Sequence, residues 1–524
     1  MAPRRAQIPA YVLAAVAPSR TTSHITQGCF RRTCATKSDR HRLVSSFIGT
    51  SNSRFIVRST FKALTEFRIE AGIISLDNSE EAVPSPAISL DDATKSKFNN
   101  WRNRVFAGIM LGYVASYFTR TCFTYASPIL RASSGITLQQ LGVITSVFPM
   151  AHGISKFVSG VIADRVDARY FLAIGLIATG FLDMLMTLQP SVQWMSFIWG
   201  LNGWVSAFVV PACARLLTTW FSSTERGFWW GLWNSSANIG GFATAIIAAY
   251  FASKFGWQMG MYVPGVIGIV AGLGVIALVR TDPSEVGLPT VEEYRGEAPA
   301  APKPKEAGEA LAEGEMSKNE IFKKYVLMNP KVWGMAICYL FLYFVRTGVT
   351  NWSHFYLMDV KGVTDATDAA TRVSGRELGG LLGNLASGAI SDKYFKGRRV
   401  PVICAFLVGI IASLCAFWAL PGGNRWLDYI TIFILGFFVY GPHMLIGLAG
   451  TELSHKSAAS SAIGFLGLIS YIGAGIAGAP LTMLVKNYGW GSFFQSMLVC
   501  CVLSMAICIP MWNAKAESAP TKTS

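Results

Sequence analysis

The chain has 524 residues, of which 52% are hydrophobic and only 14% are charged, and its mean hydropathy is +0.40. Soluble globular proteins carry about 25% charged residues, so this composition excludes an ordinary soluble domain and is typical of an integral membrane protein. The formal net charge of +15 could suggest nucleic acid as a partner, but the distribution of the charge argues against it.

Most of the positive charge lies at the N-terminus. Residues 1–62 hold eleven Lys and Arg and a single acid, Asp39, so the rest of the chain carries only +5. An Arg-rich, Ser-rich and acid-poor segment is typical of an organelle transit peptide. We therefore predict a transit peptide over 1–62 and an N-terminal tail over 63–104. Serine and threonine favour a plastid over a mitochondrion, and a disordered cytosolic tail is the other interpretation.

Long apolar stretches then recur as far as residue 512, each close to the roughly 20 residues that span a bilayer as a helix. They are continuous rather than alternating, which favours helices over a closed barrel. The predicted fold is an all-α membrane protein with twelve transmembrane helices. The predicted spans are 105–130, 137–163, 170–189, 193–220, 227–254, 258–279, 332–358, 372–391, 400–420, 427–450, 457–484 and 489–512.

A polar segment at 281–331, rich in Pro, Glu, Lys and Ala, has the composition of a solvated linker. It divides the spans into an N-terminal bundle (105–280) and a C-terminal bundle (332–512), which a tail (513–524) follows. Two landmarks occur in both halves. "YFTR" ends at Arg120 and "YFVR" at Arg346, while "SGVIADR" contains Asp164 and "SGAISDK" contains Asp392. Their similar spacing indicates an internal duplication.

The loops that follow the second and eighth predicted helices are basic, which places them on the non-translocated side together with both termini. This arrangement resembles the major facilitator superfamily. The resemblance rests on G-x-x-x-D-R-x-x-x-R at Gly160, Asp164, Arg165 and Arg169, with a weaker copy at Gly388, Asp392 and Lys393. It implies two six-helix bundles with a substrate site between them near the midplane. Asp164, Arg165, Asp392 and Lys393 are then expected to form a gate, in which an aspartate pairs across the bundles in one state.

The duplicated arginines are the main candidates for substrate binding. An arginine in hydrocarbon costs about 3 kcal/mol on insertion scales, so it needs a partner or a function. Arg120 and Arg346 lie at equivalent places in the two halves, and the planar fork of each suits bidentate capture of a phosphate or carboxylate. We expect them to bind one dianion together. The alternative is a pair of separate buried salt bridges, for instance between Arg346 and Glu377.

Other polar residues in the spans have two possible roles. The side chains of Tyr117 and Tyr343 either contact the substrate or only pack. Lys156 is either a third phosphate ligand or a snorkelling lysine. The three histidines in the spans, His152, His354 and His443, are expected to be core residues with satisfied hydrogen bonds, and Asp183 has no obvious partner.

Longer stretches resemble the organophosphate:phosphate antiporter family, especially its hexose-phosphate branch. They are "YFVRTGVTNW" (343–352), "SSTERGFWWGLWNSSANIGG" (222–241), "RELGGLLGNLASGAISDKYFKGRR" (376–399) and "YGPHMLIGLAGTELSHKSA" (440–458). The resemblance implies that Arg120 and Arg346 bind the phosphate group, that Lys156 is the lysine of the second helix, and that Tyr440 is the tyrosine of the tenth helix, which we include among the substrate-binding residues. It also implies that Glu377 takes part in salt-bridge switching.

Four positions depart from the family pattern. Ala237 replaces the histidine of the glycerol-3-phosphate members, and Asn351 replaces an aspartate of the seventh helix. Ile463 and Leu466 replace the charged pair of the bacterial hexose-phosphate permease in the eleventh helix. These changes weaken any assignment of glycerol 3-phosphate and leave the choice of sugar open.

The sequence therefore predicts a secondary transporter, acting as a monomer, that exchanges a sugar phosphate for inorganic phosphate by alternating access. Glucose 6-phosphate is the favoured substrate. The alternatives are a glycerol-3-phosphate or other organic-anion transporter, or a sugar-phosphate sensor with a transporter fold. No enzyme motif, metal cluster or cofactor site is predicted. The expected location is the plastid inner envelope, with the mitochondrial inner membrane or another endomembrane as alternatives.

Overall fold

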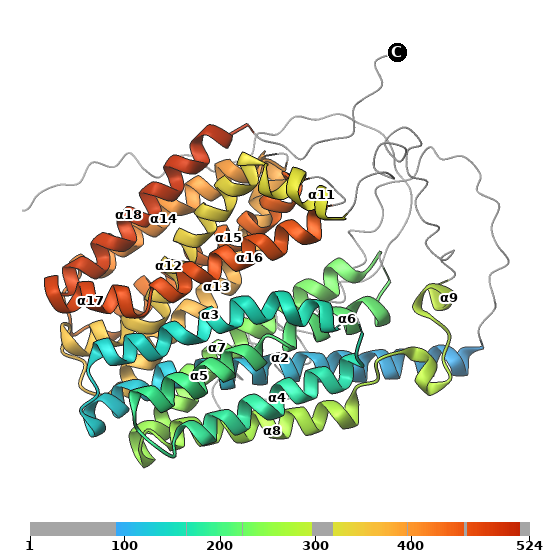
Figure 1. Ribbon diagram of the computed structural model, residues 1–524, viewed down its shortest axis with the longest axis horizontal. Coiled ribbons are helices and arrows are strands. Elements are labelled where there is room, and N and C mark those ends of the chain that lie inside the picture. Colours follow the sequence, from blue (N-terminus) through green and yellow to red (C-terminus); the bar gives the residue numbers. More distant parts are fainter. Residues whose placement is uncertain are drawn as a thin grey trace, which may run out of the picture. The chain divides into compact units, whose positions relative to one another are not determined.

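The structure is a computed structural model that describes residues 91–163, 165–222, 224–295, 318–395, 397–454 and 458–513. These residues form helices and no strands. The helices fall into two groups that follow one another along the chain, coloured blue to green and yellow to red in Figure 1. Residues 1–62, the predicted transit peptide, lie outside the described residues.

The N-terminal bundle contains six spans, of which the fourth is divided into two helices. Its helices are α2 (Asp92–Ser134), α3 (Leu138–Ala163), α4 (Ala168–Met186), α5 (Val192–Ser206), α6 (Val209–Trp220), α7 (Arg226–Phe255) and α8 (Met259–Leu278). The division between α5 and α6 lies just before Pro211. A proline lacks the N–H that would continue the helical ladder, so the chain bends there.

The C-terminal bundle repeats this plan, with its fifth span divided. Its helices are α12 (Pro330–Asp359), α13 (Ala366–Phe395), α14 (Arg399–Ala419), α15 (Arg425–Glu452), α16 (Ala459–Ile476), α17 (Ala479–Tyr488) and α18 (Trp490–Cys508), which ends in the 3-10 turn η4 (Ile509–Met511). Pro480 lies in the first turn of α17, where the missing N–H costs nothing. Each of the twelve predicted spans therefore corresponds to one helix or to one divided helix.

Ten of these spans are long and apolar enough to cross a membrane, by length and composition among the described residues. The other two are α2 and α13. Both carry arginines, half-buried Arg120 in α2 and buried Arg372 and Arg376 in α13, together with many glycine, serine, threonine or tyrosine residues, which lowers their mean hydropathy. The two least apolar spans are therefore two that supply charged groups to the interior of the protein.

Some residues predicted as tail and linker are helical. α2 begins at Asp92, where the side chain of Asp91 caps the helix by accepting a hydrogen bond from the backbone N–H of Thr94 at 3.2 Å. Phe98, in this first part of α2, stacks on Tyr294 of the linker with 4.0 Å between the ring centroids. The described linker segments are η1 (Pro283–Val286), α9 (Val291–Arg295), α11 (Lys318–Phe322) and a π-helical turn, η2 (Lys323–Leu327).

The two bundles meet along α3 with α16 and α17, and along α7 with α13. Close approach requires small residues: a Cβ added to Gly142 would lie 2.1 Å from Thr482 Oγ1 and 3.1 Å from Ala479 Cα. Next to this contact, Ser146 Oγ donates to Gly475 O and accepts from the Ala479 N–H, both at 2.8 Å. Gly142 and Ser146 lie in the first half of α3, away from its basic loop.

Further contacts between the bundles lie on the same side, away from the basic loops. Thr367 Oγ1 is 3.0 Å from Ser253 Oγ, joining the start of α13 to the end of α7. At the ends of α2 and α12, Arg131 forms an ion pair with Asp359 at 3.0 Å. The bundles are thus closed against each other at the ends opposite the basic loops.

Candidate functional site

A cavity of about 110 Å³ lies between the two bundles. Residues of eight helices line it, and most of their side chains are aromatic, hydroxylated or charged. The lining residues are Tyr117, Arg120, Thr121, Thr124, Tyr125, Thr145, Phe148, Pro149, Trp199, Gly241, Tyr343, Arg346, Thr347, Thr350, Asn351, Arg376, Glu377, Tyr440, Tyr471 and Ala474. Of the substrate-binding residues predicted from the sequence, all except Lys156 line this cavity.

Arg120 of α2 and Arg346 of α12 line the cavity from opposite bundles. The guanidinium carbon of Arg120 lies 5.1 Å from the ring centroid of Tyr117 and 5.9 Å from that of Phe148. Neither arginine forms an ion pair with a carboxylate of the described residues. The separate buried salt bridges that were the alternative to a common site are therefore not seen in the described part of the chain.

Arg346 is held by aromatic rings and by a histidine. Its guanidinium carbon lies 4.9 Å from the ring centroid of Tyr440 and 5.6 Å from that of Tyr343. His443 Nε2 lies 3.2 Å from Arg346 Nη1 and 3.1 Å from Tyr343 Oη. The sequence prediction treated His443 as a core residue, but the structure places it against the arginine of the site.

A third arginine, Arg376 of α13, also lines the cavity and was missed in the sequence. Its Nη2 forms an ion pair with Glu377, whose Oε2 accepts a hydrogen bond from Tyr440 Oη at 2.8 Å. The backbone carbonyl of Glu377 accepts from Asn238 Nδ2 of α7 at 2.8 Å. Glu377 thus pairs with Arg376 and Tyr440, and no ion pair joins it to Arg346 among the described residues. The signal for Arg376 was its place beside Glu377 in an otherwise apolar, glycine-rich helix.

Lys156 lies outside the residues that line the cavity. Its Nζ is 5.7 Å from the ring centroid of Tyr471, a lining residue of α16 that the sequence prediction did not single out. Lys156, on α3, therefore places a positive charge beside a lining residue of the opposite bundle. Tyr471 also lies close enough to both arginines to interact with them electrostatically.

Among the described residues, the predicted gate residues Arg165, Asp392 and Lys393 form no ion pair across the bundles in this conformation. Asp164 lies outside the described residues, and Arg165 is exposed in the turn after α3. Asp392 forms an ion pair with Arg399 of its own bundle, and Lys393 lies over the ring of Tyr394 at 5.6 Å. Arg399 also binds Glu452 at 3.0 Å, which joins α14 to the end of α15.

The remaining predictions concern buried residues away from the arginines. His152 Nδ1 lies 2.9 Å from Ser206 Oγ, as expected of a satisfied core residue. His354 is a core residue as predicted, but its hydrogen bonding differs from the prediction, because neither buried ring nitrogen has a hydrogen-bond partner among the described residues. Asp183 accepts a hydrogen bond from Asn202 Nδ2 at 2.8 Å, which gives it the partner that the sequence did not reveal.

The positions that depart from the family pattern have structural consequences. Asn351 lines the cavity and accepts a 3.2 Å hydrogen bond from Thr124 of the opposite bundle. Ala237 is buried in the apolar core of the N-terminal bundle. Ile463 is exposed on the surface of its bundle and Leu466 is buried in the core. Of these four positions, only Asn351 belongs to the cavity.

The charges that line the cavity are three arginines and one glutamate, which gives a net charge of +2. Since Arg376 and Glu377 form a neutral pair, the excess belongs to Arg120 and Arg346. A phosphate monoester is close to a dianion at neutral pH, because its second pKa is about 6. The site therefore has the charge and the donors to neutralise one phosphate group.

Comparison with known proteins supports this assignment. Residues 109–478 match the family model described as Major Facilitator Superfamily. The chain is 41% identical over 439 residues to a "Probable hexose phosphate transport protein" of Chlamydia trachomatis, covering 82% of this chain and 95% of that protein. It is 39% identical over 432 residues to the "Membrane sensor protein UhpC" of Salmonella typhimurium, covering 82% and 96%.

A solved structure shares the fold. It is a bacterial homologue of the human lysosomal transporter Spinster in an inward-facing conformation, with a TM-score of 0.63 and 16% identity, and it covers 80% of this chain and 99% of that one. The family match, the two six-helix bundles and the curated relatives agree with one another. The chain is an integral, multi-pass membrane protein that belongs to the major facilitator superfamily and, within it, to the organophosphate:phosphate antiporter family.

Proposed function

We propose that this protein exchanges a hexose phosphate, with glucose 6-phosphate the favoured substrate, for inorganic phosphate. The observation that supports this most strongly is the pair of arginines, Arg120 and Arg346, which face one cavity from opposite bundles without a carboxylate partner among the described residues. A buried guanidinium without an anion is costly, so a phosphate group that binds both arginines relieves a cost that the empty site bears.

The size of the cavity supports a conformational change during transport. Small-molecule sites commonly occupy about 300–1,000 Å³. A cavity of about 110 Å³ holds a phosphate group, but a hexose needs additional space. In the proposed cycle, the bundles separate on the side of the basic loops to admit the sugar and close again around it.

Exchange rather than net flux follows from the same charges. In the empty site, two guanidinium groups repel one another across the cleft and disfavour the occluded state. A bound dianion removes this repulsion, so the loaded protein changes its facing state faster than the empty one does. Only a difference in binding between states can produce this effect, and an anion held by both bundles provides it.

The test is transport by the purified protein in liposomes preloaded with unlabelled phosphate. Labelled glucose 6-phosphate should enter only when inorganic phosphate or a phosphate ester is inside the liposomes. Empty liposomes and liposomes loaded with sulfate are the controls. Uptake that is equal in all three would contradict the proposed exchange, and no uptake of any phosphate ester would contradict transport itself.

A second candidate function is sugar-phosphate sensing, because one of the relatives is a membrane sensor protein. A sensor would bind the sugar phosphate without exchanging it rapidly. Two results together would favour this function over transport. Calorimetry would show binding of the sugar phosphate, and the label taken up by the liposomes would not exceed the sum of protein-free background and ligand bound to the protein.

We also propose that the protein functions as a monomer in an organelle membrane, with the plastid inner envelope as the favoured location. The support is the Arg-rich, Ser-rich and acid-poor composition of residues 1–62. A fluorescent protein fused after residue 70 should enter plastids. Import into mitochondria would assign the protein to a mitochondrial membrane instead. Diffuse cytosolic fluorescence would contradict a transit peptide.

A further inference from the structure

Arg376 has hydrogen-bonding capacity that the described residues do not use. Its side chain is 2% exposed, and only Nη2 is paired, with Glu377. Nε and Nη1 are buried without a hydrogen-bond partner among the described residues. Leaving buried donors unpaired is unfavourable, and most of all for a charged group. Because Arg376 lines the cavity, a ligand in that cavity is the natural partner for these donors.

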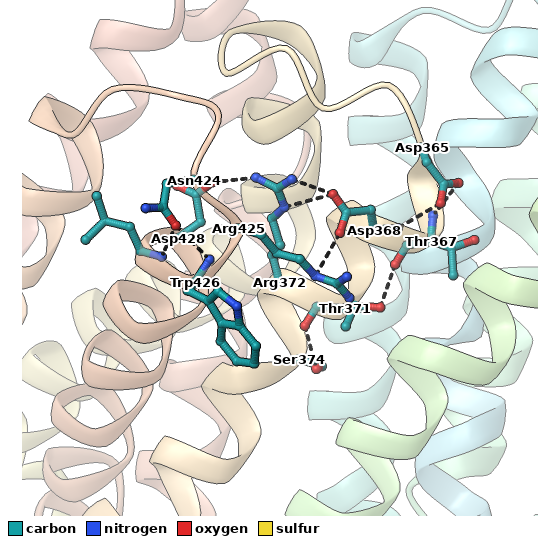
Figure 2. A network of polar contacts seen from close by, with 11 residues as sticks. Asp365, Thr367, Asp368, Thr371, Arg372, Ser374, Asn424, Arg425, Trp426 and Asp428 are labelled. Atoms are coloured by element: carbon teal, nitrogen blue, oxygen red, sulfur yellow. Dashed lines mark hydrogen bonds and ion pairs between the residues drawn. The ribbon is translucent and has the colours of Figure 1, made fainter.

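Another arginine of the same helix shows what a purely structural role looks like. Arg372 precedes Arg376 by one turn of α13 and uses its whole fork, since it binds Asp368 through Nε and Nη2 and Asp428 through Nη1 at 2.8 Å. Figure 2 shows this network, in which Arg372 lies between the two aspartates. Arg372 does not line the cavity. The unused donors of Arg376 are therefore a property of its position and not of the helix.

The phosphate group of the substrate does not require Arg376. The positive charge of Arg376 is balanced by Glu377, while Arg120 and Arg346 supply the two charges that a dianion needs. What Arg376 and Glu377 offer together is a set of N–H donors beside carboxylate acceptors. A hydroxyl group both donates and accepts, so neighbouring hydroxyls of a sugar can bind both members of such a pair.

The surroundings of the pair suit a polyol as well. Thr124, Tyr125 and Asn351 line the same cavity and carry neutral hydrogen-bonding groups. Tyr125 lies close enough to Arg376 to interact with it electrostatically. This set of residues offers hydroxyl and amide groups without adding a net charge, which is what the uncharged part of a sugar phosphate requires.

We propose that Arg376, together with Glu377, binds the hydroxyl groups of the sugar and so determines specificity for a hexose phosphate over inorganic phosphate. This inference rests on the proposed function, because it assigns the sugar-binding part of the same site. It gives the cavity two regions: a cationic one for the phosphate group, formed by Arg120 and Arg346, and a neutral one for the sugar.

The test compares binding of glucose 6-phosphate and of inorganic phosphate to the purified full-length protein by calorimetry. The double variant Arg376→Gln/Glu377→Gln removes the pair without changing the net charge. We expect its affinity for glucose 6-phosphate to fall about tenfold or more, because charge-assisted hydrogen bonds are lost, and its affinity for phosphate to change less than about twofold. Arg376→Lys keeps the charge but loses the planar guanidinium. It should also lower the affinity for glucose 6-phosphate relative to the affinity for phosphate.

The matched control is Arg372→Gln, which should lower the melting temperature but leave the ratio of the two affinities unchanged. An unchanged ratio in both Arg376 variants would overturn the inference, as would an equal loss of both affinities. Should the double variant fail to fold, Arg376→Lys alone decides the question. Because these are binding measurements, a wild-type protein that binds glucose 6-phosphate but does not exchange it contradicts the proposed antiport only. A wild-type protein that binds no glucose 6-phosphate overturns this inference too.

Discussion

At the scale of single residues, the geometry of the two cavity arginines matters as well as their charge. A guanidinium binds a phosphate through two parallel hydrogen bonds, whereas an ammonium acts as a point charge. Aromatic rings and His443 surround Arg346 and hold it in place, while Tyr117 and Phe148 do the same for Arg120. This support comes from neutral groups, which leaves the positive charges for the ligand.

The first prediction follows from this geometry. Arg120→Lys and Arg346→Lys should each raise the KM for exchange of glucose 6-phosphate by about 10- to 100-fold, since each loses one charge-assisted hydrogen bond and its alignment. Labelled uptake into phosphate-loaded liposomes measures the effect. Arg425→Lys is the control, because Arg425 is a more exposed arginine paired with Asp368 outside the cavity. An effect of the same size in the control would contradict a specific role for the fork.

The site residues most readily predicted from the sequence are those that recur in both halves of the chain. Arg120 and Arg346 could be predicted because the tetrapeptides around them recur in both halves. Arg376 has no copy in the N-terminal half, and its neighbour Glu377 had already been given a role. His443 and Tyr471 could not be recognised, because a histidine or tyrosine in an apolar helix is more often a packing residue. Only the folded arrangement shows that His443 contacts Arg346 and that Tyr471 lines the same cavity as both arginines.

At the scale of secondary-structure elements, packing between the bundles depends on the absence of side chains. Gly142 of α3 touches Thr482 and Ala479 of α17, on the side away from the basic loops. A leucine at this position cannot fit while the bundles are closed there. The same substitution meets no obstacle when the bundles are apart at this end. Its effect therefore depends on which side of the membrane the site faces.

We therefore expect Gly142→Leu to fold but to disfavour the conformation described here, and to lower the exchange rate at least about tenfold. Gly274→Leu is the matched control, since a Cβ on Gly274 of α8 meets nothing within 4 Å. Exchange rate and melting temperature are measured together for both variants. Normal exchange by Gly142→Leu would show that the contact between α3 and α17 is not part of the transport cycle.

A buried charge network fixes the outer ends of the C-terminal helices. Asp428 of α15 binds Lys361 and Arg372, both at 2.8 Å, and its side chain is 1% exposed. Removing one partner from a buried ion pair costs about 3–5 kcal/mol, because the remaining charges lose their compensation. Asp428→Asn should thus lower the melting temperature of the purified protein by several degrees.

Asp392→Asn is the comparison for this stability measurement. The Asp392 side chain is 68% exposed, so its ion pair with Arg399 is screened by water and contributes about 1 kcal/mol or less. Equal melting temperatures for the two variants would contradict a stabilising role of the network around Asp428.

The elements themselves were largely predictable. Apolar runs predicted twelve spans, because a bilayer requires about 20 apolar residues in each. Ten of the helices found are apolar enough by composition, and α2 and α13 are less so. The divisions between α5 and α6 and between α16 and α17 were missed, since both runs stay apolar while only a proline marks the bend. The early start of α2 was missed for the opposite reason: residues 92–104 are polar, and their helix is stabilised by a cap and by contacts with the linker.

At the scale of the whole molecule, alternating access requires that contacts on one side of the membrane form while those on the other side break. Ser146, Thr367 and the Arg131–Asp359 pair all join the bundles on the side away from the basic loops. These contacts define a closed outer end. Transport must break them, so each should be weak enough to open within a turnover.

The Arg131–Asp359 pair fits this requirement, because its side chains are 36% and 29% exposed. A pair of this kind contributes about 0.2–1 kcal/mol. Asp359→Asn should therefore raise the population of the outward-open state by at most about fivefold. The rate at which a membrane-impermeant thiol reagent modifies Thr124→Cys reports this population, and the charge swap Arg131→Asp/Asp359→Arg should restore it. A labelling rate insensitive to both changes would exclude the pair from the gate.

The central claim is that one phosphate group binds Arg120 and Arg346 at the same time. A double-mutant cycle on phosphate binding, measured by calorimetry with the wild type, Arg120→Ala, Arg346→Ala and the double variant, tests it most directly. Shared binding predicts that each single substitution lowers the affinity about 100-fold and that the double substitution lowers it by much less than the product of the two. Losses that multiply, or a single variant that binds phosphate normally, would contradict a common site.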